Sequence, residues 1–224
     1  MPSRHEEKYI IDYQQYAILR ARAMGVLTPD ANAKNGSYVI TSLYFDDPMH
    51  NALFEKLDGL PEHSKFRIRT YDYSDRVIKL ERKDKFGILT HKMDASITRD
   101  QIPLLDGGAT QLSAFSGSAY ELAAQIQAGG YQPCVAVRYR RDAFTFCGSD
   151  LRLTFDTEME AISPDAESLF SPDVRGVPVF DRNTVIMEIK YGDYLPGFVR
   201  KLTQADTKQL SVSKYALCRE IFML

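Results

Sequence analysis

The stretch KFRIRTY, residues 65–71, alternates charged and apolar side chains. Successive side chains of a β-strand point to opposite faces, so Lys65, Arg67 and Arg69 share one face, and Phe66 and Ile68 share the other. The apolar face is that of a strand packed on a core. The three like charges repel one another unless water or an anion lies between them. The stretch therefore predicts a strand that forms either a solvated sheet surface or one wall of an anion site.

Charged and apolar residues also alternate in RHEEKYII (4–11), VIKLERKDK (77–85), LRLTFDTEM (151–159) and VIMEIKYGD (185–193). Strand geometry places these side chains on the charged faces: Arg4, Glu6 and Lys8; Lys79, Glu81 and Lys83; Arg152, Thr154, Asp156 and Glu158; Glu188 and Lys190. In PCVAVRYRRDAF (133–144), Tyr139 and Arg141 share a face opposite Arg138 and Arg140, unless a bulge shifts the register. A solvated face usually mixes polar types loosely, whereas here Arg and Lys recur two residues apart. The recurrence favours an anion-binding interior.

Eight strands are expected, near residues 3–11, 37–46, 64–73, 76–84, 86–95, 132–147, 150–160 and 183–192. Helices are expected over residues 12–24, 47–57, 118–130 and 211–224, and residues 163–178 should be loop with a short helix at most. Several strands are joined by very short connections, which implies antiparallel neighbours. The predicted fold class is α+β, built on a large antiparallel sheet.

The composition is that of a globular protein, and its length favours one domain spanning residues 1–224. The formal net charge of −2 gives no reason to expect nucleic acid or an acidic membrane as partner. No signal core or membrane-spanning run is found, so we expect no direct membrane insertion and a cytoplasmic location. The three cysteines lack a CxxC pair, which favours reduced thiols over disulfides or zinc. The sequence also lacks P-loop and Rossmann fingerprints.

Eight such strands can curl into a closed or nearly closed barrel whose apolar face the helices cover. The charged residues would then line a tunnel. Like charges cannot be desolvated together at low cost, so a tunnel rich in Arg and Lys needs a polyanion. Arg binds phosphate oxygens bidentately, and a few carboxylates suit a divalent cation that bridges phosphates. The pattern predicts a tunnel for a linear phosphate chain.

On these residues the sequence resembles the triphosphate tunnel metalloenzymes, or CYTH-like superfamily, and within them the VTC domain of polyphosphate polymerases. The matching stretches, in order, are EEKYII, TSLYFDD, KFRIRTY, IKLERKDK, RYRRDAF, LRLTFDT, VIMEIKY and SVSKYAL. The resemblance implies an eight-stranded antiparallel β-barrel that binds ATP with Mn²⁺ or Mg²⁺. It implies an ATP:polyphosphate phosphotransferase, which transfers the γ-phosphoryl of ATP to a growing polyphosphate chain.

The resemblance also implies roles for individual residues. Phosphate ligands would be Lys8, Arg67, Arg69, Lys83, Lys92, Arg141, Arg152, Lys190 and Lys214, with Tyr139 and Ser213 as hydrogen-bonding neighbours. The arginines among them, Arg67, Arg69, Arg141 and Arg152, would neutralise charge on the transferred group. Glu188 and Glu6 would hold the metal, whereas Arg4 occupies the position of the superfamily's first glutamate. The chain carries no regulatory or membrane-helix segment of the polymerase complexes, so coupling to membrane translocation would need a separate membrane partner.

Two other functions stay open from the sequence. A triphosphatase would use the same tunnel with water as the acceptor, positioned by Glu81 or Glu158. A non-catalytic sensor would bind polyphosphate or nucleotide without turnover. Metal identity, phosphate chain length and oligomeric state are not determined by these motifs.

Overall fold

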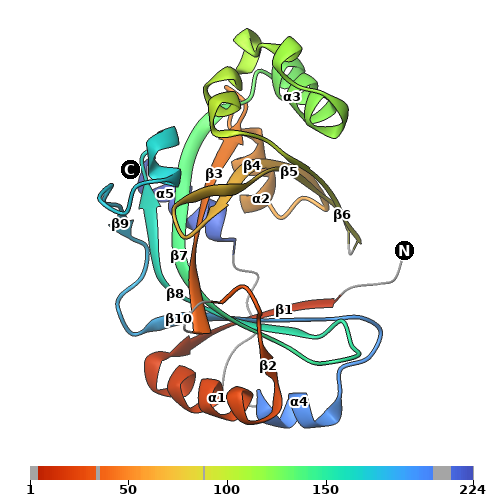
Figure 1. The fold of residues 1–224 in the computed structure, drawn as a ribbon, viewed down its shortest axis with the longest axis vertical. Helices are drawn as coiled ribbons and strands as arrows, with labels where there is room; N and C mark the ends of the chain where they lie inside the picture. The colour runs from red at the N-terminus through yellow and green to blue at the C-terminus, as the bar shows by residue number, and fades with distance from the viewer. Residues whose placement is uncertain (1–4, 34–35, 88, 204–212, 224) are drawn as a thin grey trace. The chain divides into compact units, whose positions relative to one another are not determined.

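The structure is a computed structural model that describes residues 5–33, 36–87, 89–203 and 213–223 (Figure 1). Its strands are β1 His5–Asp12, β2 Thr28–Pro29, β3 Ser37–Asp46, β4 Glu62–Tyr71, β5 Ser74–Phe86, β6 Leu89–Ser96, β7 Gln132–Thr145, β8 Arg152–Ile162, β9 Val177–Pro178 and β10 Thr184–Tyr191. Its α-helices are α1 Tyr13–Val26, α2 Asn51–Leu57, α3 Gly117–Gly129, α4 Gly197–Leu202 and α5 Lys214–Ile221. Short 3₁₀ helices are η2 Arg99–Leu104, η3 Gly107–Ala109, η4 Leu112–Ala114 and η5 Ala166–Leu169.

The strands form a sheet with the hydrogen-bonded order β1-β10-β8-β7-β3-β4-β5-β6, and the two-residue strands β2 and β9 pair with β7 and β8. The recorded pairings are antiparallel. The predicted α+β class and large antiparallel sheet are confirmed, although the sheet has ten strands where an eight-stranded barrel was expected, because β2 and β9 add two short strands. Within the described residues the sheet is not closed, since β1 and β6 end the path.

The chain forms two compact units, and the prediction of one domain stays a prediction. The first unit contains residues 1–39, 139–159 and 180–212. Its core includes Leu153 and Phe155 of β8 and Met187 of β10, which pack with Leu19 of α1 and Val199 of α4. Asp12 ends β1 and begins α1, because its carboxylate accepts from Gln15 N while the Gln15 side chain accepts from Asp12 N.

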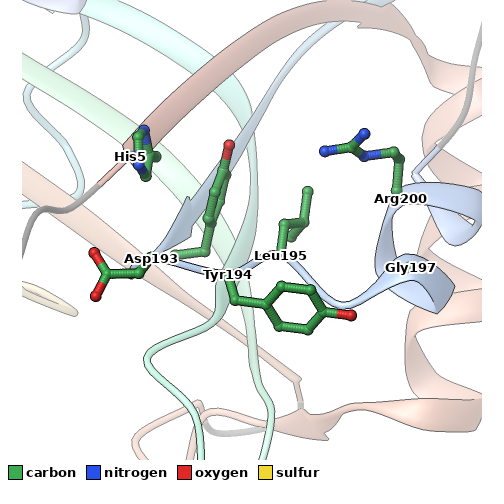
Figure 2. A pocket seen from close by; sticks show the side chains of 7 residues that line it. His5, Asp193, Tyr194, Leu195, Gly197 and Arg200 are labelled. Atoms are coloured by element: carbon green, nitrogen blue, oxygen red, sulfur yellow. The ribbon is translucent and has the colours of Figure 1, made fainter.

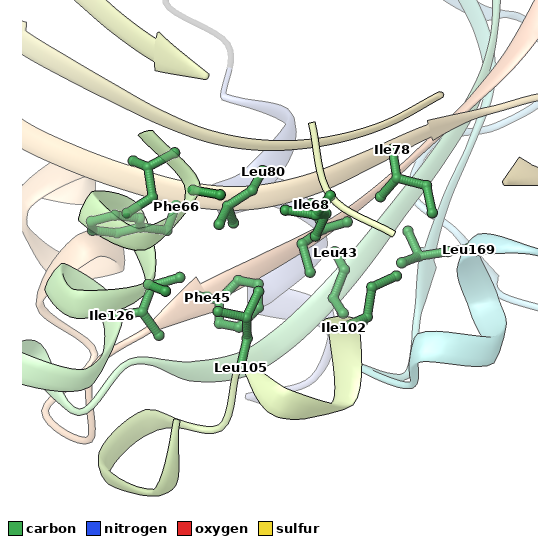
Figure 3. Packing of buried hydrophobic residues seen from close by; sticks show 14 of the residues in the cluster. Leu43, Phe45, Phe66, Ile68, Ile78, Leu80, Ile102, Leu105, Ile126 and Leu169 are labelled. Carbon is green, nitrogen blue, oxygen red and sulfur yellow. The ribbon is translucent and has the colours of Figure 1, made fainter. Parts of the chain in front are cut away.

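The second unit contains residues 40–138, 160–179 and 213–224. Figure 3 shows its core, in which side chains of β3, β4 and β5 meet those of η2, of η5, of α3 and of Leu105, which follows η2. The labelled residues are Leu43, Phe45, Phe66, Ile68, Ile78, Leu80, Ile102, Leu105, Ile126 and Leu169. Helix α3 ends at Gly130, whose φ of 63° a glycine adopts without strain. Because the even-numbered positions 66, 68, 78 and 80 are buried here, the odd-numbered cations of β4 and β5 face the other side of the strands.

Over the described residues, the expected strands and helices agree with the structure to within about four residues, and residues 163–178 contain only η5 and β9. Helix α4 was not expected, and residues 3–4, 211–212 and 224 of the expected elements lie outside the described residues. One orientation was wrong. Glu158 adopts a left-handed backbone conformation with φ of 53°, which interrupts the alternation of β8. Its carboxylate is therefore exposed and lies 3.4 Å from Arg140 Nε, not beside Asp156.

Candidate functional site

The first cluster of predicted site residues lies in the second unit and is called the β4–β5 cluster. It comprises Ser42 and Tyr44 of β3, Lys65, Arg67 and Arg69 of β4, Lys79, Glu81 and Lys83 of β5, Lys92 and Asp94 of β6, and Ser213 and Lys214 at α5. The strand register brings these side chains together in rows. Tyr44 pairs with Arg67, Arg67 with Glu81, and Glu81 with Asp94. A neighbouring row pairs Lys65 with Lys83 and Lys83 with Lys92.

Glu81 is the buried carboxylate at the centre of the β4–β5 cluster. Its Oε2 accepts from Arg67 Nε at 2.6 Å, and its Oε1 lies 2.7 Å from Lys92 Nζ. Arg67 Nη1 also donates to the Tyr44 hydroxyl at 3.0 Å, and Arg69 Nε donates to Ser42 Oγ at 3.2 Å. Because cations outnumber carboxylates in this cluster, it favours an anion.

The ionisation of Glu81 should contribute to stability. Burial on its own raises the pKa of Glu81. The charges of Arg67 and Arg69, with the hydrogen bond and charge of Lys92, outweigh burial and lower the pKa of this carboxyl to about 2. A carboxyl whose folded-state pKa lies below its unfolded value stabilises the fold above the unfolded pKa, and that stabilisation is lost as pH falls toward the folded pKa.

We therefore expect the free energy of unfolding to fall between pH 4.5, the ordinary pKa, and about pH 2, and to fall less steeply in Glu81→Gln. Urea titrations at a series of pH values would measure this. If the free energy of unfolding fell equally steeply with decreasing pH in the unsubstituted chain and in Glu81→Gln, the assigned charge state of Glu81 would be contradicted.

The N-terminus of α5 belongs to the same cluster. Ser213 caps the helix by accepting from Ala216 N, and Lys65 Nζ lies 3.3 Å from its hydroxyl. Lys214 is the first helical residue, and its charge acts on Tyr44. Tyr215 anchors the helix, because its buried hydroxyl donates to Asp46 at 2.5 Å. The structure thus brings Ser213 to Lys65 of β4 and Lys214 near Tyr44 of β3, and their roles in phosphate binding stay predictions.

The second cluster lies in the first unit and is called the β1–β10 cluster. It comprises Glu6 and Lys8 of β1, Glu188 and Lys190 of β10, Arg152 and Asp156 of β8, and Tyr139 and Arg141 of β7. Lys190 Nζ lies 2.5 Å from Glu188 and 3.7 Å from Glu6, and Lys8 Nζ lies 2.7 Å from Glu6. The two predicted metal-binding carboxylates therefore lie around one lysine.

Arg141 and Asp156 form a buried bidentate pair in the β1–β10 cluster. Arg141 Nε and Nη2 donate to the two Asp156 oxygens at 2.6 Å and 2.7 Å. Burial lowers the pKa of Arg141, but the adjacent Asp156 outweighs this effect and holds the pKa well above its ordinary value. The guanidinium lies 5.2 Å from the centre of the Tyr139 ring. Tyr139 and Arg141 therefore share a face, as predicted.

Arg152 is held by partners that sequence reasoning missed. Its Nη2 donates to Asp30 at 2.7 Å and to the Tyr38 hydroxyl at 2.9 Å. Asp30 follows the short strand β2 and gave no pattern in the sequence, whereas Tyr38 alternates with apolar residues at the start of β3. Two other arginines lie outside the clusters: Arg138 donates to backbone carbonyls of residues 168, 171 and 174, and Arg140 is exposed.

The carboxylates suit a divalent metal that arrives with phosphate. No group of three or more His, Cys, Asp or Glu side chains in the described part of the chain is arranged to hold a metal ion. Mg²⁺ and similar cations in phosphate sites commonly take one or two carboxylates plus phosphate oxygens. Glu6 and Glu188, which lie around Lys190, fit that requirement, and phosphate oxygens would complete the coordination.

A pocket of about 420 Å³ lies elsewhere in the first unit (Figure 2). It is lined by His5 and Tyr191, whose rings stack 5.1 Å apart, and by Tyr194, Leu195 and Arg200. His5 and Tyr191 precede Glu6 and follow Lys190, so strand alternation turns them to the opposite face. The pocket is thus not part of the β1–β10 cluster.

The VTC domain family model matches residues 3–223. The chain belongs to the VTC domain family. No curated protein matches the sequence. The solved structure of the putative adenylyl cyclase HpAC1 from Hippeastrum, described as having a dominant triphosphatase activity, is similar to this VTC domain with a TM-score of 0.58 and 16% identity over 96% of this chain and 94% of that one. The solved structure of a putative adenylate cyclase from Bacillus halodurans is similar with a TM-score of 0.54 and 9% sequence identity. The similarity covers 94% of this chain and 95% of that one.

At these identities the two structures show the fold alone, which this chain shares with them over most of its length. The predicted family and fold are confirmed. Among the residues that the structure describes, no helix of the VTC domain has the length and apolar character needed to cross a membrane. The individual site residues remain predictions, which the geometry of the two clusters now supports.

Proposed function

We propose that this VTC domain is a metal-dependent polyphosphate polymerase that transfers the γ-phosphoryl of ATP to the end of a polyphosphate chain. The observation that carries the proposal is the β4–β5 cluster, in which Arg67, Arg69 and the lysine row of Lys65, Lys83 and Lys92 share one face. Guanidinium and ammonium groups so arranged bind phosphate oxygens with charge-assisted hydrogen bonds.

In the proposed reaction, a terminal oxygen of polyphosphate forms a bond to the γ-phosphorus while the bond from that phosphorus to the β,γ-bridging oxygen breaks. ADP leaves with the electron pair of the broken bond. Phosphoryl transfer needs alignment and charge neutralisation rather than covalent help from the protein. Arg67, Arg69, Arg141 and Arg152 supply that neutralisation. Arg141 is already oriented by Asp156, which leaves its Nη1 for a phosphate oxygen.

Glu188 and Glu6 would hold the metal, either Mn²⁺ or Mg²⁺. When bound, the cation neutralises phosphate charge and fixes the orientation of the phosphates. Lys190, which contacts both carboxylates, would then pair with phosphate oxygens instead. Lys8 would keep Glu6 in place from the same strand.

The two carboxylates that could position water for a triphosphatase are not arranged for it. Both oxygens of Glu81 are engaged by Arg67 and Lys92, and Glu158 is exposed beside Arg140. A phosphate terminus is already anionic and needs no general base. The triphosphatase remains the second candidate because the similar Hippeastrum protein is described as a triphosphatase.

Product analysis distinguishes the candidates. The purified chain incubated with ATP and Mn²⁺ is expected to form long phosphate chains and ADP, visible on a polyacrylamide gel stained for polyphosphate. Orthophosphate as the only phosphate product would instead assign a triphosphatase.

In Glu188→Gln we expect metal-dependent turnover to fall about 100-fold while tripolyphosphate binding is retained. Binding without any turnover in the unsubstituted chain would assign a sensor.

The proposed partners are ATP and polyphosphate. A cytoplasmic location agrees with the free state of Cys134, Cys147 and Cys218. A separate membrane partner is also proposed, for export of the product across a membrane. We also propose that residues 1–224 act as one domain, because the VTC family model runs through both compact units.

A further inference from the structure

Tyr44 is a buried tyrosine within the β4–β5 cluster that carries no role in the sequence predictions. The residue is 7% exposed, and the strand register places it beside Arg67. Its ring packs against the Tyr215 ring at a centroid distance of 5.1 Å, and the Arg67 guanidinium lies 5.7 Å from its ring centre. Tyr44 is therefore fixed by packing between β4 and α5.

The Tyr44 hydroxyl has a proton for which the described part of the chain offers no acceptor. Its oxygen accepts from Arg67 Nη1 at 3.0 Å, and within the described residues no group accepts its proton. Two other tyrosines donate to carboxylates: the buried Tyr215 to Asp46 and the half-buried Tyr16 to Asp142. A buried hydroxyl donor usually finds an acceptor, because leaving it unmatched costs free energy. The missing acceptor points to a ligand.

The charges around Tyr44 identify the kind of ligand. The titratable and charged groups that face it are Arg67 and Arg69 of β4, Glu81 of β5 through Arg67, Lys214 and Tyr215 of α5, and Cys134 of β7, whose thiol donates to the Tyr44 carbonyl. Burial raises the pKa of Tyr44, but the charges of Arg67 and Arg69, with a smaller effect of Lys214, lower it below the ordinary value. An anionic acceptor is favoured at this position.

We propose that the Tyr44 hydroxyl donates a hydrogen bond to an oxygen of the phosphate chain held by Arg67, Arg69 and Lys214. Tyr44 is thus a further substrate-binding residue of the β4–β5 cluster. The inference rests on the proposed function to the extent that condensed phosphate is the ligand. It does not depend on whether the phosphate is polymerised or hydrolysed.

Isothermal titration of tripolyphosphate, without metal, tests the proposal. Tyr44→Phe keeps the buried ring, and Arg67 remains held by Glu81, so the variant removes chiefly the donor. We expect its dissociation constant at pH 7 to be about tenfold higher than that of the unsubstituted chain. The matched control is Tyr16→Phe, which removes a half-buried hydroxyl that donates to Asp142 in the first unit, and its affinity should be unchanged.

The pH dependence separates donation from a structural effect. As pH rises through the pKa of Tyr44, the unsubstituted chain loses its donor and gains an anion, whereas Tyr44→Phe does neither. The ratio of the two dissociation constants should therefore fall toward one between pH 7 and pH 10, about the ordinary phenol pKa. A ratio of one at pH 7, or one that stays constant, would overturn the donor role. Failure of the unsubstituted chain to bind tripolyphosphate would overturn both this inference and the proposed function.

Discussion

Replacing Arg67 with alanine is expected to lower kcat/KM for ATP in polyphosphate synthesis by about 100- to 1000-fold. At the centre of the β4–β5 cluster, Arg67 donates hydrogen bonds to Glu81 and to the Tyr44 hydroxyl. Its guanidinium is therefore held in place before phosphate binds. A preorganised cation stabilises the charge that develops during phosphoryl transfer without reorganising. Initial rates of ADP release at several ATP concentrations would measure the loss.

The matched control for this prediction is Arg140→Ala. Arg140 is an exposed arginine of β7 that pairs with Glu158, outside both clusters. Its removal also deletes one positive charge from the chain, so a general electrostatic effect would appear in both variants. We expect kcat/KM of Arg140→Ala to stay within about twofold of the unsubstituted value, because surface ion pairs contribute little. Equal losses in the two variants would refute a specific role of Arg67.

Replacing Asp156 with alanine is expected to lower the free energy of unfolding by about 3–5 kcal/mol. The Asp156 side chain is fully buried, and that of Arg141 is 10% exposed, so the substitution leaves an uncompensated charge in the interior of the first unit. Urea denaturation at pH 7 would measure the change. The same substitution should also impair turnover, because Asp156 orients Arg141 through two hydrogen bonds.

Two further variants test the reason for this loss. Adding Arg141→Met to Asp156→Ala removes the isolated charge and should recover much of the lost stability, since a buried ion pair often contributes little over apolar packing.

In Asp30→Ala, the partner Arg152 keeps a side chain that is 41% exposed and can be solvated by water. That variant should lose at most about 1 kcal/mol. A loss as large as that of Asp156→Ala would contradict burial as the cause.

Alternation along single strands was enough to predict the strands and the faces on which their charged side chains lie. The odd-numbered cations of residues 65–69 face away from the core because a strand has a period of two residues, whatever surrounds it. The same rule placed Glu81 on one face with Lys79 and Lys83, and Glu188 on one face with Lys190. It failed at Glu158, where one left-handed residue reverses the side-chain direction.

The amino-acid sequence by itself determined the strands, their charged faces and the preference for an anion, because these depend on residue type and on contacts between neighbours in the chain. Only the tertiary structure decided which charges neutralise one another. Asp30 meets Arg152, Asp156 meets Arg141, and Tyr44 lies beside Arg67 because strand register brings distant segments together. Partner choice depends on distance and burial in the folded chain, and neither quantity can be read from the period of a single strand.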